Sequence, residues 1–424
     1  MPAPQLDRRL GLSDAVFIGM GSMLGAGVFS AFAPAARAAG GGMLVGLAVA
    51  AVIAYCNATA SAQLAMRYPV SGGTYVYGRE RLGAWWGFAA GWGFVVGKTA
   101  SCAAMALTFA SYAVPQDRWV QRLVAAVAVV ALTALNVRGI TRTALLTRVL
   151  VSLTLLALTV VVVATIASGN AGLHRIDGIG ASPYHVLQAA GLLFFAFAGY
   201  ARIATMGEEV RDPARTIPRA ILIALALVVV GYLVVGTTAL SAAGPARLAG
   251  SSAPLATALD AVGASGVSPV ARVGGAVASL GALLALIAGI GRTSLAMARN
   301  RDLPAVLAEV HPRFHVPHRA EGALAAAVVV LVLSVDLRGA IGFSSFGVLV
   351  YYAIANASAM TQRGTERSWP RWLNALGVAG CVVLAATLPW PSVVAGVGMF
   401  AVGLLGRWIV LARRARAQAA AAQS

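Results

Sequence analysis

About twelve stretches of roughly 20 mostly apolar residues follow one another along the chain, separated only by short segments. A stretch of that length crosses the hydrocarbon core of a bilayer as an α-helix. Hydrophobic residues make up 59% of the 424 positions and charged residues only 11%, which excludes an ordinary soluble globular protein. The sequence therefore predicts an all-α polytopic membrane protein with about twelve transmembrane helices.

The charge lies in the segments between these stretches, so the segments define the predicted spans. A short helix is expected at the outer surface over Ala253–Val262, between the seventh and eighth spans. We expect residues 1–424 to form a single transmembrane domain, because no segment is long enough to be a linker. The predicted spans are 13–37, 41–66, 84–113, 119–136, 146–168, 185–207, 217–241, 268–298, 320–335, 339–361, 371–388 and 391–412.

The formal net charge is +18, which in a soluble protein would suggest binding to nucleic acid. Here the arginines lie at the ends of apolar stretches, mostly on the side that holds both termini. This asymmetry follows the positive-inside rule and predicts cytoplasmic N- and C-termini, with no nucleic-acid partner. The abundant alanine and the single lysine are typical of a GC-rich bacterial genome, so we expect a bacterial inner-membrane protein.

Two spans are interrupted where they should be most apolar. The first contains four glycines between Gly19 and Gly27, and the sixth contains Ala198-Gly199-Tyr200. Glycine costs about 1 kcal/mol relative to alanine inside a helix. In lipid, a broken helix is tolerated only where the freed backbone groups line a cavity within the protein. Both spans are therefore predicted to unwind.

Interruptions in spans one and six are typical of a transporter built from two inverted halves, with its site near the membrane midplane. Spans one to five (about 13–168) and six to ten (about 185–361) would form a 5+5 inverted repeat, and spans eleven and twelve (about 371–412) would be peripheral. Unwound backbone can bind a carboxylate through N–H groups and an ammonium group through carbonyls. The predicted substrate-binding residues are Ser22, Met23, Leu24, Gly25, Ala26, Gly27, Phe195, Ala196, Phe197, Ala198, Gly199 and Tyr200.

Other interpretations of these residues are open. The glycines of the first span can instead allow close helix packing, as in small-xxx-small motifs. The aromatic residues of the sixth span can be ordinary packing groups, although Phe195 and Tyr200 are candidates for a gate. Cys56, Cys102 and Cys381 lie in apolar stretches without metal-ligand spacing, so no metal site is predicted.

Two cationic residues are predicted inside the spans. Lys98, the only lysine, lies near the middle of the third span, where a charged side chain costs about 2.5 to 3.5 kcal/mol. It is a candidate proton-coupling group, and a static ammonium held by helix carbonyls is the alternative. Arg202 follows the break in the sixth span and can pair with a substrate carboxylate or with a residue such as Glu208. No Asp or Glu is expected in the core spans, which argues against a dicationic substrate.

Four separated motifs resemble the amino acid–polyamine–organocation superfamily, particularly its amino acid permeases near the cationic amino acid transporter branch. The first-helix motif is Gly21-Ser22-Met23-Leu24-Gly25-Ala26-Gly27, and the loop after the second helix is Tyr68-Pro69-Val70-Ser71-Gly72-Gly73. Residues 194–220 resemble the sixth-helix signature, and Arg292 to Pro304 resemble the end of the eighth helix. The resemblance implies secondary transport of an amino acid or related amine by alternating access, without ATP hydrolysis or a bound cofactor.

The sequence departs from the family pattern at positions that bear on the substrate. Where many relatives carry an acid after the sixth-helix motif, this chain has Ala201 and Arg202, which argues against a cationic substrate. Some proton-coupled relatives carry a lysine in the fifth helix, whereas Lys98 lies in the third span. We expect proton-coupled uptake or exchange of a neutral amino acid. Basic amino acid or polyamine antiport is the alternative.

Two other classes of protein compete with a transporter. A channel or a non-transporting sensor can be built on the same spans. A membrane-embedded enzyme would need a catalytic cluster in the spans, and the five histidines all lie in loops or near span ends, so no catalytic residue is predicted. The sequence does not decide the oligomeric state.

Overall fold

The computed structural model describes residues 10–69, 72–114, 117–138, 144–176, 180–207, 209–314 and 316–421. Within these ranges the chain is helical and contains no β-strand, apart from an isolated parallel bridge between Leu10 and Val210. This confirms the predicted all-α class.

Seventeen α-helices are assigned within the described ranges. The first eight are α1 (Leu12–Met23), α2 (Ala26–Ser30), α3 (Phe32–Ala39), α4 (Met43–Arg67), α5 (Thr74–Leu82), α6 (Ala84–Ala113), α7 (Arg118–Val137) and α8 (Ala144–Ala167). The remainder are α9 (Pro183–Phe197), α10 (Ala201–Ala204), α11 (Pro213–Gly250), α12 (Pro254–Ala261), α13 (Ser268–Arg299), α14 (His318–Ser334), α15 (Leu337–Met360), α16 (Arg371–Thr387) and α17 (Trp390–Ala421).

Ten helical segments of the described chain are long and apolar enough to cross a membrane. Two shorter helices, α14 and α16, have 17 residues each and lie at the predicted ninth and eleventh spans. All twelve predicted spans therefore correspond to helices. The short helix predicted over 253–262 is also present, as α12 over Pro254–Ala261.

Both predicted breaks are present. The first span divides at Gly25, whose ψ of −125° ends the helical path between α1 and α2. The sixth span changes at Ala198–Tyr200 into a 3₁₀ turn, η3, and continues for only four residues as α10. The sixth span does not unwind as predicted but is tightened into a 3₁₀ turn, because Ala198 (φ −67°, ψ 1°) and Tyr200 (φ −64°, ψ −18°) keep nearly helical dihedral angles.

The helices of the two halves pack in matching pairs. In the first half α6 packs on α15 of the second, and in the second half α13 packs on α8 of the first. The pairs α1 with α11 and α9 with α4 correspond in the same way. Each half holds five spans, an odd number, so equivalent helices run in opposite directions through a membrane. This arrangement agrees with the predicted 5+5 inverted repeat.

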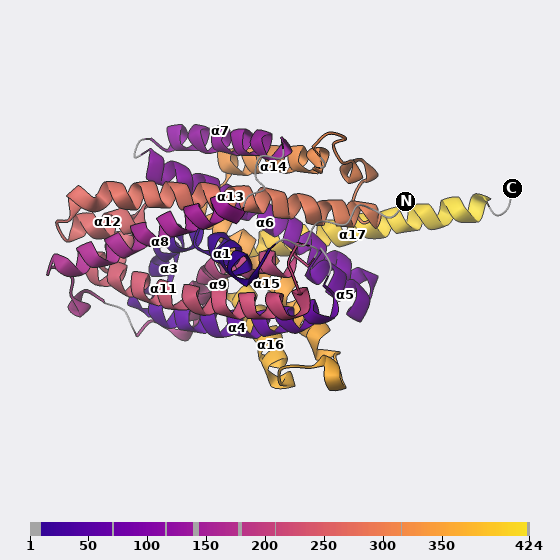
Figure 1. Cartoon of the computed structure of the whole chain (residues 1–424), viewed down its shortest axis with the longest axis horizontal. Helices are drawn as coiled ribbons and strands as arrows, with labels where there is room; N and C mark the ends of the chain where they lie inside the picture. The colour runs from indigo at the N-terminus through magenta and orange to yellow at the C-terminus, as the bar shows by residue number, and fades with distance from the viewer. Residues whose placement is uncertain are drawn as a thin grey trace.

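The centre of the bundle is filled by the helices next to the breaks. In the most apolar 18 residues of α6, 83% of the residues are buried, whereas the corresponding share in α17 is only 17%. Figure 1 shows α16 at one edge of the bundle and α17 extending past the other helices, at the end where α5 lies. These two last spans are peripheral, as predicted, and α12 lies at the opposite end of the bundle.

Candidate functional site

The two helix breaks touch through their backbones. A methyl group added at Gly199 would lie only 2.3 Å from the carbonyl oxygen of Ser22 and 2.6 Å from the amide nitrogen of Met23. Only glycine leaves room for this approach, so Gly199 is required here for contact rather than for an unusual dihedral angle. Residues that are 177 positions apart in the sequence thus meet at one point inside the bundle.

The glycines of the first break also pack tightly against other helices. A methyl group at Gly27 would lie 2.9 Å from the Cα atom of Ala196 in α9, and one at Gly25 would lie 2.3 Å from Cβ of Ala282 in α13. The break and close packing are therefore properties of the same glycines. The close-packing interpretation of this motif is confirmed, and substrate binding by the same backbone stays a prediction.

Carbonyl groups at the two breaks are bound by one phenol. The hydroxyl of Tyr232, on α11, lies 2.5 Å from the carbonyl oxygen of Met23 and 3.0 Å from that of Ala196. Its ring also packs against Phe197, with 5.1 Å between ring centroids. Tyr232 thus joins the end of α1 to the end of α9. No sequence signal indicated it, because it is an aromatic residue within a long apolar stretch.

Lys98 contributes a second donor to the sixth-span break. Its side chain is only 4% exposed, and Nζ donates a hydrogen bond of 3.0 Å to the carbonyl oxygen of Ala198. The hydroxyl of Tyr352, on α15, donates to the same oxygen at 3.4 Å. The single lysine of the chain therefore binds the backbone of the predicted site, which agrees with both the coupling and the static interpretation.

The predicted gate aromatics are buried at the break. Phe195 is 6% exposed and Tyr200 is fully buried. The ring of Tyr200 lies 5.1 Å from that of Tyr352, measured between centroids, at an interplanar angle of 34°. In this conformation both residues are covered, and neither faces water.

Arg202 is held by neighbours of its own segment. It donates a 3.0 Å hydrogen bond to Oγ1 of Thr205 and lies 3.9 Å from Oε1 of Glu209. Glu209 also forms an ion pair with Arg292 of α13. Glu208, which the sequence suggested as a partner, lies outside the described residues. The carboxylate that pairs with Arg202 in the structure is that of Glu209, the residue after Glu208.

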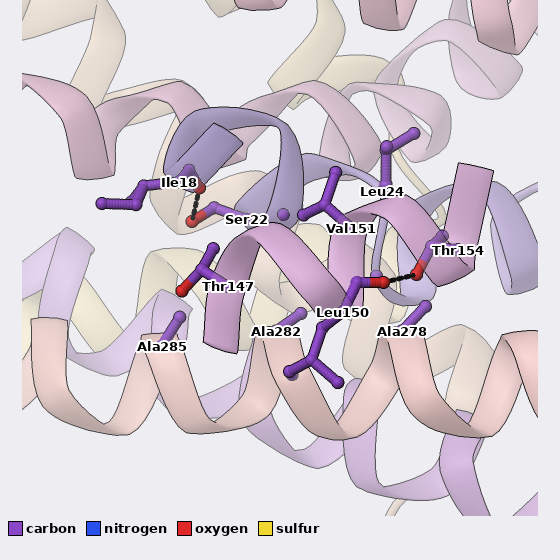
Figure 2. Close-up of a pocket in the computed structure, with 13 residues that line it drawn as sticks. Ile18, Ser22, Leu24, Thr147, Leu150, Val151, Thr154, Ala278, Ala282 and Ala285 are labelled. Carbon is purple, nitrogen blue, oxygen red and sulfur yellow. Dashed lines mark hydrogen bonds between the residues drawn. The ribbon is translucent and has the colours of Figure 1, made fainter. Parts of the chain in front are cut away.

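A small cavity adjoins the first break. It has a volume of about 40 Å³ and lies between α1, α8 and α13, as Figure 2 shows. Ser22, Leu24 and Gly25 of the predicted set line it, but no residue of the sixth-span break does. The Ser22 hydroxyl facing it donates to the carbonyl of Ile18 at 2.9 Å. The space suits a few water molecules and is too small for an amino acid that has a side chain.

The structure thus brings the two predicted backbone segments and Lys98 together, and places Arg202 in a separate group of charges. Nothing is described for the side chain of Ala26. Sequence analysis missed one buried carboxylate, Glu321, which lies in the first turn of α14 and is 2% exposed. It lies in the predicted ninth span, so the expectation that the core spans contain no Asp or Glu is wrong.

Residues 10–410 match the amino acid permease family, which is nearly the whole chain. The chain belongs to the amino acid permease family. The match confirms the resemblance drawn from the four motifs, and it makes this permease a multi-pass membrane protein of a family of transporters.

Three relatives illustrate the range of the family. An uncharacterised transporter of Mycobacterium tuberculosis is 59% identical over 416 residues, covering 97% of this permease and 94% of the relative. A branched-chain amino acid permease of Bacillus subtilis is 25% identical, covering 94% and 92% of the two chains. A chloroplastic cationic amino acid transporter of Arabidopsis thaliana is 29% identical, covering 91% and 71%. The second and third of these relatives are named for the transport of amino acids.

Proposed function

We propose that this permease moves a neutral amino acid across a bacterial inner membrane by alternating access, coupled to protons, with both termini in the cytoplasm. The observation that carries the proposal is the contact between Gly199 and Ser22, because it joins equivalent breaks of two inverted halves. Paired breaks of this kind surround the substrate in secondary transporters. In the conformation described here the two breaks are closed on each other.

Recognition of the substrate would use the backbone. The first N–H groups of a helix lack partners within it, so those at the start of α2, around Gly25 to Gly27, are suited to a substrate carboxylate. The carbonyls of Met23, Ala196 and Ala198 now accept hydrogen bonds from Tyr232 and Lys98. A substrate ammonium group entering between the breaks would replace these donors, so substrate binding and opening of the contact would be linked.

The charges around the breaks favour a neutral substrate. Lys98 is buried against Ala198, and the carboxylate of Glu209 is already paired with Arg202 and Arg292. A cationic side chain brought to this place would meet like charge without a buried acid to balance it. The Bacillus subtilis relative, named for branched-chain amino acids, supports the same choice.

Basic amino acid or polyamine antiport is the second candidate, favoured by the relatives named cationic amino acid transporters. A non-transporting sensor is a third and weaker candidate, because it would use the same binding site without alternating access.

Lys98 is our proposed proton-coupling residue. Its charged form donates a strong hydrogen bond to the Ala198 carbonyl, and its neutral form donates a weaker one. Loss of the proton would therefore loosen the sixth-span break from α6. Arg202 would act at the same stage through Glu209, by holding the segment after the break rather than by releasing a proton.

A thermal-shift screen of the detergent-purified protein against amino acids and polyamines tests the substrate class. Ligand that binds only the folded state raises stability by mass action. Stabilisation by neutral amino acids, followed by their saturable counterflow in liposomes, is the expected result. Stabilisation by basic amino acids or polyamines alone would replace our proposal with the antiporter, and binding without counterflow would favour a sensor.

A further inference from the structure

Four charged residues form a chain that leads from the sixth-span break to α14. Arg202 of α10 lies 3.9 Å from Glu209, and Glu209 forms an ion pair with Arg292 of α13. Glu321 of α14 packs against Gly291, the residue before Arg292. The four charges thus alternate in sign along this path.

Glu321 packs against the turn of α13 that carries Arg292. A methyl group on Gly291, the residue before Arg292, would lie 3.1 Å from Cγ and 3.3 Å from Oε1 of Glu321. The side chain is 2% exposed, and its Oε2 atom has no hydrogen-bond partner among the described residues. Leaving an ionised carboxylate buried without a cation is costly, whereas a protonated one is neutral. The ionisation of Glu321 therefore depends on whether Arg292 is available to it.

The other charges near Glu321 do not take the place of Arg292. On α14 itself, His318 and Arg319 both pair with Glu309, which follows the 3₁₀ turn η5 (Ala305–Ala308). From α7, Asn136 interacts with Glu321 without carrying a charge, and the nearby Arg138 is exposed. The charged residue of α6, Lys98, bonds to Ala198. Among the described residues, Arg292 is the cation on the turn of α13 against which Glu321 packs.

The two carboxylates belong to parts of the protein that are attached differently. Glu209 lies in the segment after α10, where its carbonyl accepts from the Leu10 amide at 3.1 Å and the Arg211 amide donates to the Leu10 carbonyl at 2.9 Å. This segment is therefore tied to the start of α1. Arg292 and Glu321 are on α13 and α14, which pack against each other. A movement of α1 and α10 away from α13 would separate Arg292 from Glu209 and leave it beside Glu321.

We propose that Glu321 is a proton-binding site that exchanges its proton for Arg292. While Glu209 holds Arg292, Glu321 carries a proton. When the segment with Glu209 moves away, the O–H bond of Glu321 breaks, the proton passes to water, and the carboxylate pairs with Arg292. This inference rests on the proposed function only for the movement itself. No charge is left unpaired in either arrangement, because Arg202 keeps Glu209 and Arg292 keeps Glu321 after the movement.

Infrared spectroscopy of the full-length protein, reconstituted in liposomes without substrate, tests the proposal. A protonated carboxylic acid has a carbonyl stretch that an ionised carboxylate lacks, and the band can be followed as pH is varied. We expect such a band in the wild type, absent in Glu321→Gln and moved in frequency in Glu321→Asp. Glu80→Gln is the control, because Glu80 is an exposed carboxylate on α5 and its loss should leave the band unchanged.

The deciding variant is Glu209→Gln, which frees Arg292 from its present partner. We expect the acid band to titrate at a pH lower by about 1 to 3 units, because an adjacent cation favours the ionised form by that amount. An unchanged titration in a variant that elutes as folded protein would overturn the exchange. Retention of the band in Glu321→Gln would overturn the site. Neither measurement requires transport, so a failure of the proposed function would appear in the flux assays alone.

Discussion

The ammonium group of Lys98 donates a 3.0 Å hydrogen bond to the carbonyl oxygen of Ala198, joining the middle of α6 to the break of the sixth span. A charged donor thus satisfies a carbonyl that a regular helix would have satisfied itself. Because Lys98 is buried, its ammonium group would be costly without this carbonyl, whereas the carbonyl has a second, longer hydrogen bond from Tyr352.

Replacing Lys98 separates its structural role from its proposed role in coupling. Lys98→Gln keeps a donor for the Ala198 carbonyl but cannot titrate, so we expect near-normal thermal stability and uptake that no longer depends on a pH gradient. Lys98→Met removes the donor as well and should cost about 1 to 3 kcal/mol of stability. Unfolding in detergent and uptake into liposomes measure the two effects. Undiminished pH-driven uptake by Lys98→Gln would eliminate the coupling role.

Gly199→Ala should separate the two breaks. The added methyl group would lie 2.3 Å from the Ser22 carbonyl, and both partners are backbone, so the helices must move apart. We expect loss of counterflow and a lower unfolding temperature. The control is Gly231→Ala in α11, where a methyl group meets no atom within 4 Å. That substitution should be neutral or stabilising by roughly 0.5 to 1 kcal/mol. Equal behaviour of the two variants would contradict the contact.

Tyr232→Phe should weaken the link between α1 and α9. It removes the hydroxyl that lies near the Met23 and Ala196 carbonyls but keeps the packing of the ring on Phe197. We expect a loss of about 1 to 3 kcal/mol in stability and altered substrate affinity. Tyr112→Phe is a suitable comparison, because its hydroxyl also binds a buried carbonyl, that of Phe29, away from the paired breaks. If both variants change affinity equally, Tyr232 has no special role at the site.

Asp302→Asn should detach α17 from the bundle. Asp302 accepts from Arg407 at 2.6 Å and from Tyr75 at 2.8 Å. Burial and this hydrogen bond raise the pKa of Tyr75, so its phenol remains a donor. Removing one member of a buried ion pair costs about 3 to 5 kcal/mol. Faster tryptic cleavage within α17 is the expected readout.

The control for this substitution is Asp212→Asn. It removes an exposed pair with Arg215, and such pairs contribute about 0 to 1 kcal/mol. Asn also tolerates the left-handed backbone conformation found at position 212, where φ is 45°. Equal cleavage of α17 in the two variants would show that Asp302 does not hold the helix.

The order of the helices and both breaks could be predicted because they depend on local composition. Long apolar stretches mark the spans, and glycines at Gly25 and Gly199 mark places where a helix does not continue or where backbones meet. The same glycines indicated that the candidate site contains backbone from both breaks. The position of Lys98 at mid-span was also visible, because a lysine in an apolar stretch is exceptional.

The partners of these groups could not be predicted, since they depend on how distant segments pack. Ala198 is 100 positions from Lys98, and nothing in the sequence pairs them. An argument from composition cannot distinguish Glu208 from Glu209. The path of the chain after α10 brings Glu209 to Arg292. Glu321 was missed because its burial results from packing of α14 on α13, beside the small residue Gly291.

The length of α17 has a practical consequence. Its 32 residues extend about 48 Å at 1.5 Å per residue, well beyond the hydrocarbon thickness of about 30 Å. Figure 1 shows the excess projecting clear of the other helices. A folded marker protein joined in helical register to this projection would stand outside the detergent belt at a fixed angle. The permease thus carries its own attachment point for the fiducial that a small membrane protein needs for alignment in electron cryo-microscopy.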